Sequence, residues 1–155
     1  MTDCRSFENR DQDEAALQVL VVDDNPLNRT LMQAMLGKIG CTVSLAENGL
    51  EGCVLATARV FDLIVMDQHM PTLDGDGATR RIRAEGASKQ AFIVRWTTEE
   101  DTRLNGELYD GELPKPLTCS PLIAAVSLAS RRALYRGDAR RSDRTQTSLD
   151  QPTRP

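Results

Sequence analysis

Polar side chains follow four short apolar runs in this chain, and their types suit a cation-binding site. Asp23 and Asp24 follow the run LQVLVV, Asp67 follows LIVM, Thr97 follows FIVRW and Lys115 follows GELP. Carboxylates brought close together repel one another and raise each other's pKa values unless cations neutralise them. Magnesium, which prefers a few carboxylate or carbonyl oxygens and several waters, and the lysine ammonium would supply that positive charge.

Each of these residues also has an ordinary explanation when taken alone. Asp23 and Asp24 could be favourable charges at the N-terminus of a helix. Asp67 could be a solvated loop residue, Thr97 a helix cap and Lys115 a surface lysine. Their joint occurrence at the ends of consecutive apolar runs favours one shared site, with Asp24 and Asp67 as direct metal ligands and Asp23 acting through water.

The elements that must position these residues alternate along the chain. Apolar runs fit strands that are buried on both faces, and the segments between them carry helical patterns. Five strands separated by helices imply parallel βα units, a doubly wound α/β sandwich that binds ligands outside the carboxyl ends of its strands. The predicted strands are 17–22, 42–46, 62–66, 92–96 and 111–114, and the predicted helices are 27–39, 49–58, 76–85 and 119–133.

Composition limits the chain to one domain with short ends. Of its 155 residues, 40% are hydrophobic and 27% are charged, and the net charge of −4 offers no general attraction to nucleic acid or to an anionic membrane. No apolar run approaches the roughly 20 residues needed to cross a bilayer, so a cytoplasmic location is expected. We predict flexible tails at 1–16 and 134–155 around a domain at 17–133.

The sequence resembles the receiver domain of response regulators from two-component signalling. The resemblance rests on VLVVDDNPLN, LIVMDQHMPTLDG, the threonine at 97 and the KP pair at 115, and it extends in order across 17–133. The segments DDNPLN and MPTLDGDGATRRIR are most like receivers of hybrid histidine kinases. The resemblance implies a flavodoxin-like (βα)5 domain with a five-stranded parallel sheet in the order 2-1-3-4-5.

The resemblance also implies a function for the strand ends. Asp67 would accept a phosphoryl group from a phosphohistidine of a histidine kinase or a histidine phosphotransfer protein, in a phosphorelay that needs Mg²⁺. Such a domain is a signalling module rather than an enzyme, although it promotes its own phosphorylation and dephosphorylation. The implied phosphoryl contacts are Thr97 and Lys115, and the implied metal ligands are Asp23, Asp24, Asp67 and the backbone carbonyl of His69.

Two side chains beside this site are predicted to set the lifetime of the phosphoryl group. In the family, the residue two positions after the acceptor, here His69, affects access of the hydrolytic water. Glu99, two residues after Thr97, is placed to face it across the pocket. Solvated side chains at a rim are the competing interpretation. Pro116 resembles the family's proline that is often preceded by a cis peptide bond.

The chain also departs from the family's pattern. Receivers commonly carry an aromatic residue three positions before the lysine, and here that position is Glu112, with Tyr109 three residues earlier. The segment between Thr97 and Lys115 is short, so we predict a shortened or frayed fourth helix. Trp96 is expected to fill the core or an interface.

Two alternatives to phosphoacceptance remain open at this point. A pseudo-receiver would bind partner proteins without phosphorylation, as Glu112 and the short fourth segment suggest. A metal-dependent phosphohydrolase would use Asp67 as a nucleophile, but such enzymes typically place a second acid two residues on, where this chain has His69. The arginines near the C-terminus show no helix-turn-helix pattern, so output through a protein partner is expected rather than DNA binding.

Overall fold

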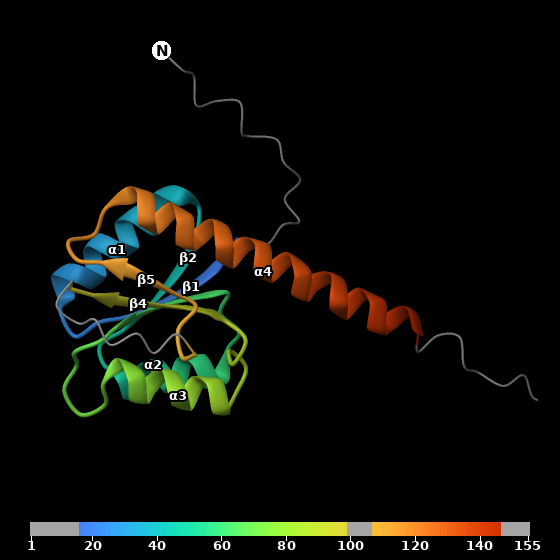
Figure 1. Cartoon of the computed structure of the whole chain (residues 1–155), viewed down its shortest axis with the longest axis horizontal. Helices are drawn as coiled ribbons and strands as arrows, with labels where there is room; N and C mark the ends of the chain where they lie inside the picture. Colours follow the sequence, from blue (N-terminus) through green and yellow to red (C-terminus); the bar gives the residue numbers. More distant parts are fainter. Residues whose placement is uncertain (1–15, 99–106, 147–155) are drawn as a thin grey trace, which may run out of the picture.

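The protein is a three-layer α/β sandwich in the computed structural model, which describes residues 16–98 and 107–146, with side chains up to 137 (Figure 1). Its five strands form one parallel sheet in the order β2-β1-β3-β4-β5, which confirms the predicted topology. The strands are β1 (Gln18–Val22), β2 (Thr42–Ala46), β3 (Leu63–Asp67), β4 (Phe92–Thr97) and β5 (Gly111–Pro114). The helices are α1 (Pro26–Ile39), α2 (Gly49–Ala58), α3 (Gly75–Ala84) and α4 (Cys119–Gln146).

The helices cover both faces of the sheet, so the central strands are buried twice. Helices α1 and α4 lie on one face, and α2 and α3 lie on the other (Figure 1). Successive residues of β3 alternate between the two cores: Leu63 and Val65 join the α1/α4 core, while Ile64 and Met66 join the α2/α3 core. This double burial explains why the strands read as unbroken apolar runs.

Side-chain caps start the helices where the chain leaves the sheet. The Asn25 side chain accepts a hydrogen bond from the backbone N–H of Leu27 at 3.0 Å, and Pro26 occupies the first turn of α1, where its missing N–H costs nothing. At the other end of α1, Gly40 has a φ of 95°, a left-handed conformation that favours glycine. These two caps set the start and the end of α1, which begins just after Asp23 and Asp24.

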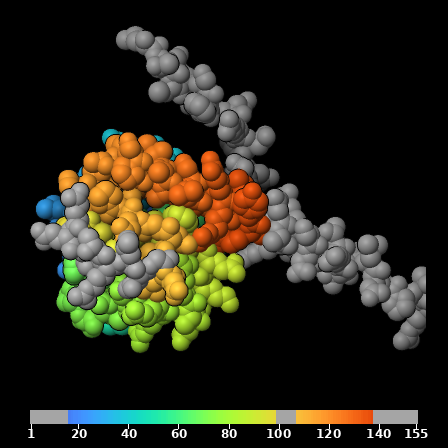
Figure 2. All heavy atoms as spheres, viewed as in Figure 1, coloured from blue at the N-terminus to red at the C-terminus, as the bar shows by residue number. Residues whose placement is uncertain are grey.

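Helix α4 continues beyond residue 133, where the sequence pattern predicted that it ends. It runs to Gln146, and Arg136 donates a hydrogen bond to Asp62 at 3.1 Å, which ties the additional turn to the base of the sheet. Figure 2 shows the described side chains of this orange-to-red helix lying against the body of the domain. No proline interrupts the sequence between 122 and 151, so a helix is locally permitted there. The boundary between domain and tail remains a prediction.

The predicted short fourth helix falls mainly on 99–106, which lies outside the described residues. In the described part of the β4–β5 connection, residue 98 and residues 107–110, the chain forms a turn and no helix. The Lys115–Pro116 peptide bond that follows β5 is cis. Among the described residues, no helix is long and apolar enough to cross a membrane.

Asp110 joins three elements at the entrance to β5. Its carboxylate accepts hydrogen bonds from Arg83 of α3 at 2.7 Å, from Arg132 of α4 at 2.8 Å and from the backbone N–H of Ile93 at 2.9 Å. Burial by itself would raise the pKa of Asp110, but the bonds from Arg132, Ile93 and Arg83 outweigh it and lower that pKa below its usual value. The ionised carboxylate therefore stabilises the folded state.

We expect Asp110→Asn to lower the free energy of unfolding by about 2 kcal/mol at neutral pH, because two arginines lose a charged partner. Since the folded-state pKa is depressed, this contribution is present above the unfolded pKa of about 3.9 and is lost as pH falls through the folded value. Urea unfolding of both proteins from neutral pH down to about pH 3 measures it. A stability difference that stays constant over that range would contradict this account of Asp110.

Candidate active site

The strand-end residues predicted from the sequence meet at one edge of the sheet. Asp23 and Asp24 follow β1, Asp67 is the last residue of β3, Thr97 is the last residue of β4 and Lys115 follows β5. The backbone N–H of Lys115 donates to the carbonyl of Thr97 at 2.8 Å, so the pairing of β5 with β4 continues up to the lysine. Parallel pairing thus brings residues separated by up to 92 positions in sequence to one place.

Three carboxylates form an acidic cluster at this edge. Ligand oxygens of Asp23, Asp24 and Asp67 all lie within 4.8 Å of one another. Asp23 is fully buried and Asp67 is 3% exposed, whereas Asp24 is exposed to solvent. Two buried carboxylates this close together need compensating positive charge.

The N-cap residue of α1 and two side chains of that helix hold Asp23 in place. Its carboxylate accepts hydrogen bonds from the backbone N–H of Asn25 at 2.8 Å and from the side-chain amide of Asn28 at 3.2 Å, and its carbonyl accepts one from Arg29 at 2.8 Å. Burial is the main cause that raises the pKa of Asp23, and the Asp67 charge adds to it, against the lowering effect of the Asn25 bond and of Lys115. The Asp23 carboxylate is therefore fixed in position, and a nearby cation would stabilise its ionised form.

Lys115 supplies one cation to the cluster. Its Nζ donates to Oδ1 of Asp67 at 2.9 Å and lies 4.0 Å from Oδ2 of Asp23. One ammonium faces three carboxylates, so the cluster keeps a negative charge that suits a divalent cation. The donor set is made of hard oxygens, with the exposed Asp24 on the solvent side, and this fits Mg²⁺.

Thr97 is in place but turned toward its own chain. The residue is 7% exposed, and its hydroxyl donates to the carbonyl of Thr98 at 3.2 Å. His69 lies in the exposed loop two residues after Asp67. Glu99 lies outside the described residues, so the predicted pairing of Glu99 with His69 remains a prediction, as does the metal role of the His69 carbonyl.

Glu112, at the position where the resemblance leads one to expect an aromatic residue, is part of an ion pair. Glu112 on β5 pairs with Arg95 on β4, whose side chain is 2% exposed. Tyr109, from the turn before β5, is 8% exposed and donates its hydroxyl to Asp76 at the start of α3 at 2.8 Å. The guanidinium of Arg95 lies 5.8 Å from the centre of the Tyr109 ring. Burial raises the pKa of Tyr109, so its hydroxyl stays protonated.

Reasoning from sequence missed Arg95, although a signal was available. A charged residue inside the apolar run FIVRW must either face solvent or find a partner, and the buried position of β4 leaves only the second choice. Glu112, the residue of β5 that is paired with Arg95 in register, supplies the partner. No sequence pattern predicted the contact between Lys115 and Trp96, whose ring centre lies 4.9 Å from the lysine Nζ.

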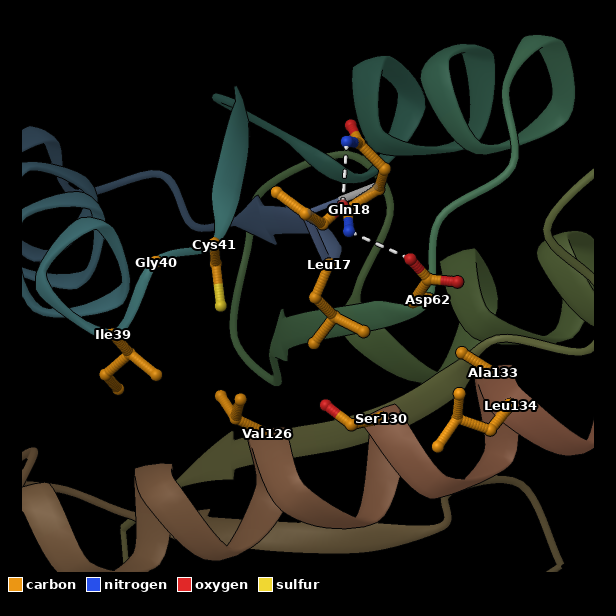
Figure 3. Close-up of a pocket in the computed structure, with 11 residues that line it drawn as sticks. Leu17, Gln18, Ile39, Gly40, Cys41, Asp62, Val126, Ser130, Ala133 and Leu134 are labelled. Atoms are coloured by element: carbon orange, nitrogen blue, oxygen red, sulfur yellow. Dashed lines mark hydrogen bonds between the residues drawn. The ribbon is translucent and has the colours of Figure 1, made fainter. Parts of the chain in front are cut away.

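A separate groove of about 570 Å³ lies at the opposite end of the strands. Figure 3 shows Leu17, Cys41, Val126 and Leu134 around it, with Gln18 hydrogen-bonded to Asp62 at the start of the sheet. None of the predicted phosphoryl or metal residues lines it. The chemistry predicted from the sequence therefore belongs to the acidic edge and not to this groove.

Comparison with known proteins agrees with the fold and the acidic edge. Residues 19–127 match the family described as the response regulator receiver domain. The receiver domain of sensor histidine kinase PA1611 from Pseudomonas aeruginosa, solved with a magnesium ion coordinated in its active site cleft, superimposes with a TM-score of 0.65 at 31% identity, covering 76% of this chain and 97% of that one. Magnesium is thus found in the corresponding cleft of a similar protein.

Relatives among characterised proteins include both kinases and small regulators. The chain is 40% identical over 116 residues to hybrid signal transduction histidine kinase G of Dictyostelium discoideum. The matched region covers 68% of this chain but only 3% of that kinase. It is 36% identical over 117 residues to two-component response regulator 24 of Arabidopsis thaliana, covering 73% of this chain and 84% of that protein. With its flavodoxin-like sheet, its acidic edge and a family match over more than half of its length, the chain belongs to the response regulator receiver domains.

Proposed function

We propose that this receiver accepts a phosphoryl group on Asp67 from a phosphohistidine of a histidine kinase or a histidine phosphotransfer protein. A carboxylate oxygen of Asp67 would bond to phosphorus as the bond from phosphorus to the histidine nitrogen breaks. One observation carries the proposal: Asp67 is held at 2.9 Å by Lys115, with two further carboxylates within 4.8 Å. Phosphoryl transfer mainly requires such positioning and charge neutralisation.

The surrounding residues have defined tasks in this reaction. Asp23, Asp24 and Asp67, with the carbonyl of His69, would hold Mg²⁺, which when bound would neutralise charge on the phosphoryl oxygens. The Lys115 ammonium would stabilise the negative charge that develops on those oxygens. The Thr97 hydroxyl, which now donates to Thr98, would turn to bond one of them.

We further propose that the protein is a cytoplasmic signalling module, not an enzyme with turnover, and that it acts through a protein partner. Similarity to receivers of both hybrid kinases and single-domain regulators supports this role. His69 and Glu99 would modulate the lifetime of the phosphoryl group, and Glu112 would be a further modulating residue. The domain would begin at 17, after a tail at 1–16, and its C-terminal boundary, predicted at 133, would lie further along α4, which runs to Gln146.

A pseudo-receiver is the second candidate, and one observation favours it. Glu112 is engaged by the buried Arg95 at the position where receivers commonly carry their switching aromatic residue. An interaction module that needs no phosphate would tolerate this replacement. The intact Asp67–Lys115 pair favours phosphoacceptance over it.

Incubation of the chain with Mg²⁺ and acetyl phosphate decides between the two candidates. We expect intact mass spectrometry to show one added phosphoryl group, which is absent when EDTA replaces Mg²⁺ and which is released by hydroxylamine, as expected of an acyl phosphate. A chain that takes up no phosphoryl group at any donor concentration, while remaining folded, would support the pseudo-receiver.

A further inference from the structure

We propose that Trp96 is a positioning residue for the Lys115 ammonium, a role that rests on the phosphoacceptor function proposed above. The Nζ of Lys115 lies 4.9 Å from the centre of the Trp96 ring, within the range of a cation–π interaction. The same Nζ donates to Asp67 at 2.9 Å. The indole is thus the third group that fixes the ammonium, beside the two carboxylates.

Strand register explains how the three side chains come together. Asp67 of β3 is paired with Trp96 of β4, and Trp96 is paired with Leu113 of β5, two residues before Lys115. Residues two apart in a strand face the same side, and neighbouring strands lie roughly 4.8 Å apart. To reach Asp67 from the end of β5, the lysine side chain must cross β4. The β4 residue that is paired with Asp67 is Trp96.

Packing alone gives an incomplete account of this tryptophan. Trp96 is 2% exposed and belongs to the α1/α4 core, as expected of a core filler. Its indole Nε1 is buried without a hydrogen-bond partner among the described residues, and leaving a buried donor unpaired is costly. A leucine or phenylalanine at this position would be apolar throughout and would avoid that cost. The flat ring under a cation is what the indole adds.

Two substitutions separate the effect of the aromatic ring from the effect of side-chain volume. Trp96→Phe keeps an aromatic face beneath Lys115, whereas Trp96→Leu keeps an apolar side chain without one; both leave the core with less volume than tryptophan does. We expect Trp96→Leu to reduce the saturating rate of phosphorylation by acetyl phosphate and Mg²⁺ about tenfold, with the donor and Mg²⁺ concentrations for half-saturation changed less than twofold. Trp96→Phe should stay within about threefold of the wild-type rate.

Val94→Ala is the matched control, because Val94 lies two residues earlier on β4 and faces the same core. It should destabilise the protein and leave the phosphorylation rate of the folded chain within about twofold of wild type. If Val94→Ala slows phosphorylation as much as Trp96→Leu does, or if Trp96→Leu matches the wild type, the positioning role is wrong.

A second measurement does not depend on phosphorylation. In the proton NMR spectrum, the ε-methylene protons of Lys115, assigned by their loss in Lys115→Met, should be shifted upfield by the indole ring current and should return toward ordinary lysine values in Trp96→Leu. An unshifted resonance in the wild type would overturn the proposal. If the shift is present and the chain takes up no phosphoryl group, the contact stands and the phosphoacceptor function is what fails.

Discussion

Asp67→Asn is expected to abolish phosphorylation by acetyl phosphate and Mg²⁺, leaving no detectable adduct by intact mass. The amide has no anionic oxygen to attack phosphorus, and it removes one of the three carboxylates that could hold the metal. The substitution keeps the shape of a side chain that is 4% exposed, and an amide oxygen still accepts the hydrogen bond from Lys115. The loss should therefore be chemical and not structural.

The same substitution has a second expected effect, on the neighbouring acid. The Asp67 charge is one of the causes that raise the pKa of Asp23. Removing it should lower the pKa of Asp23, which a carboxyl carbon NMR titration without Mg²⁺ would measure. A pKa that stays the same or rises would mean that the two carboxylates do not interact as their spacing implies.

Asp74→Asn is the matched control for the loss of the adduct. Asp74 caps α3 by accepting a hydrogen bond from the backbone N–H of Gly77 at 2.8 Å, and asparagine is an equally good cap. This change also turns an aspartate into its amide, seven residues along the same connection. It should leave the adduct intact. An adduct that persists in Asp67→Asn would place the acceptor at another residue.

Much of the fold was predictable because each strand carries its own signal. The central strands β1, β3 and β4 are buried on both faces, so they appear as short apolar runs. The observed bounds of all five strands agree with the predicted ones to within one residue. The end of α4 was not predictable in this way. The turn beyond residue 133 is tied to the sheet by the ion pair between Arg136 and Asp62, two residues that lie 74 positions apart in the sequence.

The positions of the chemical groups were predictable, but their partners were not. Parallel strands must deliver their last residues to one edge, which is why Asp67 and Lys115 could be placed together from the sequence. Which side chains contact each other across that edge depends on strand register, and the alternation of apolar and polar residues does not specify it. The contact of Lys115 with Trp96 and the pairing of Arg95 with Glu112 both follow from that register.

Lys115→Met should slow phosphorylation by acetyl phosphate about 100-fold or more, because it removes the fixed charge that the developing phosphoryl charge would meet. Methionine keeps an unbranched apolar stem against Trp96, so the packing beside the ring changes little.

Lys115→Met should also lower the stability of the protein, because without Mg²⁺ it leaves Asp23 and Asp67 buried together with no ammonium. Breaking such a pair costs about 3 to 5 kcal/mol when it is fully buried, and because Lys115 is 25% exposed we expect about 2 kcal/mol.

Magnesium should restore part of that stability in Lys115→Met, since a divalent ion supplies the positive charge that the variant lacks. Urea unfolding of the wild type and the variant, each in EDTA and in saturating Mg²⁺, measures the stability lost in Lys115→Met and the stability gained from Mg²⁺. The gain from Mg²⁺ should be larger in the variant than in the wild type. Lys89→Met, at an exposed lysine on the connection between α3 and β4, should change neither quantity. An equal gain from Mg²⁺ in the two proteins would mean that the lysine and the metal do not neutralise the same carboxylates.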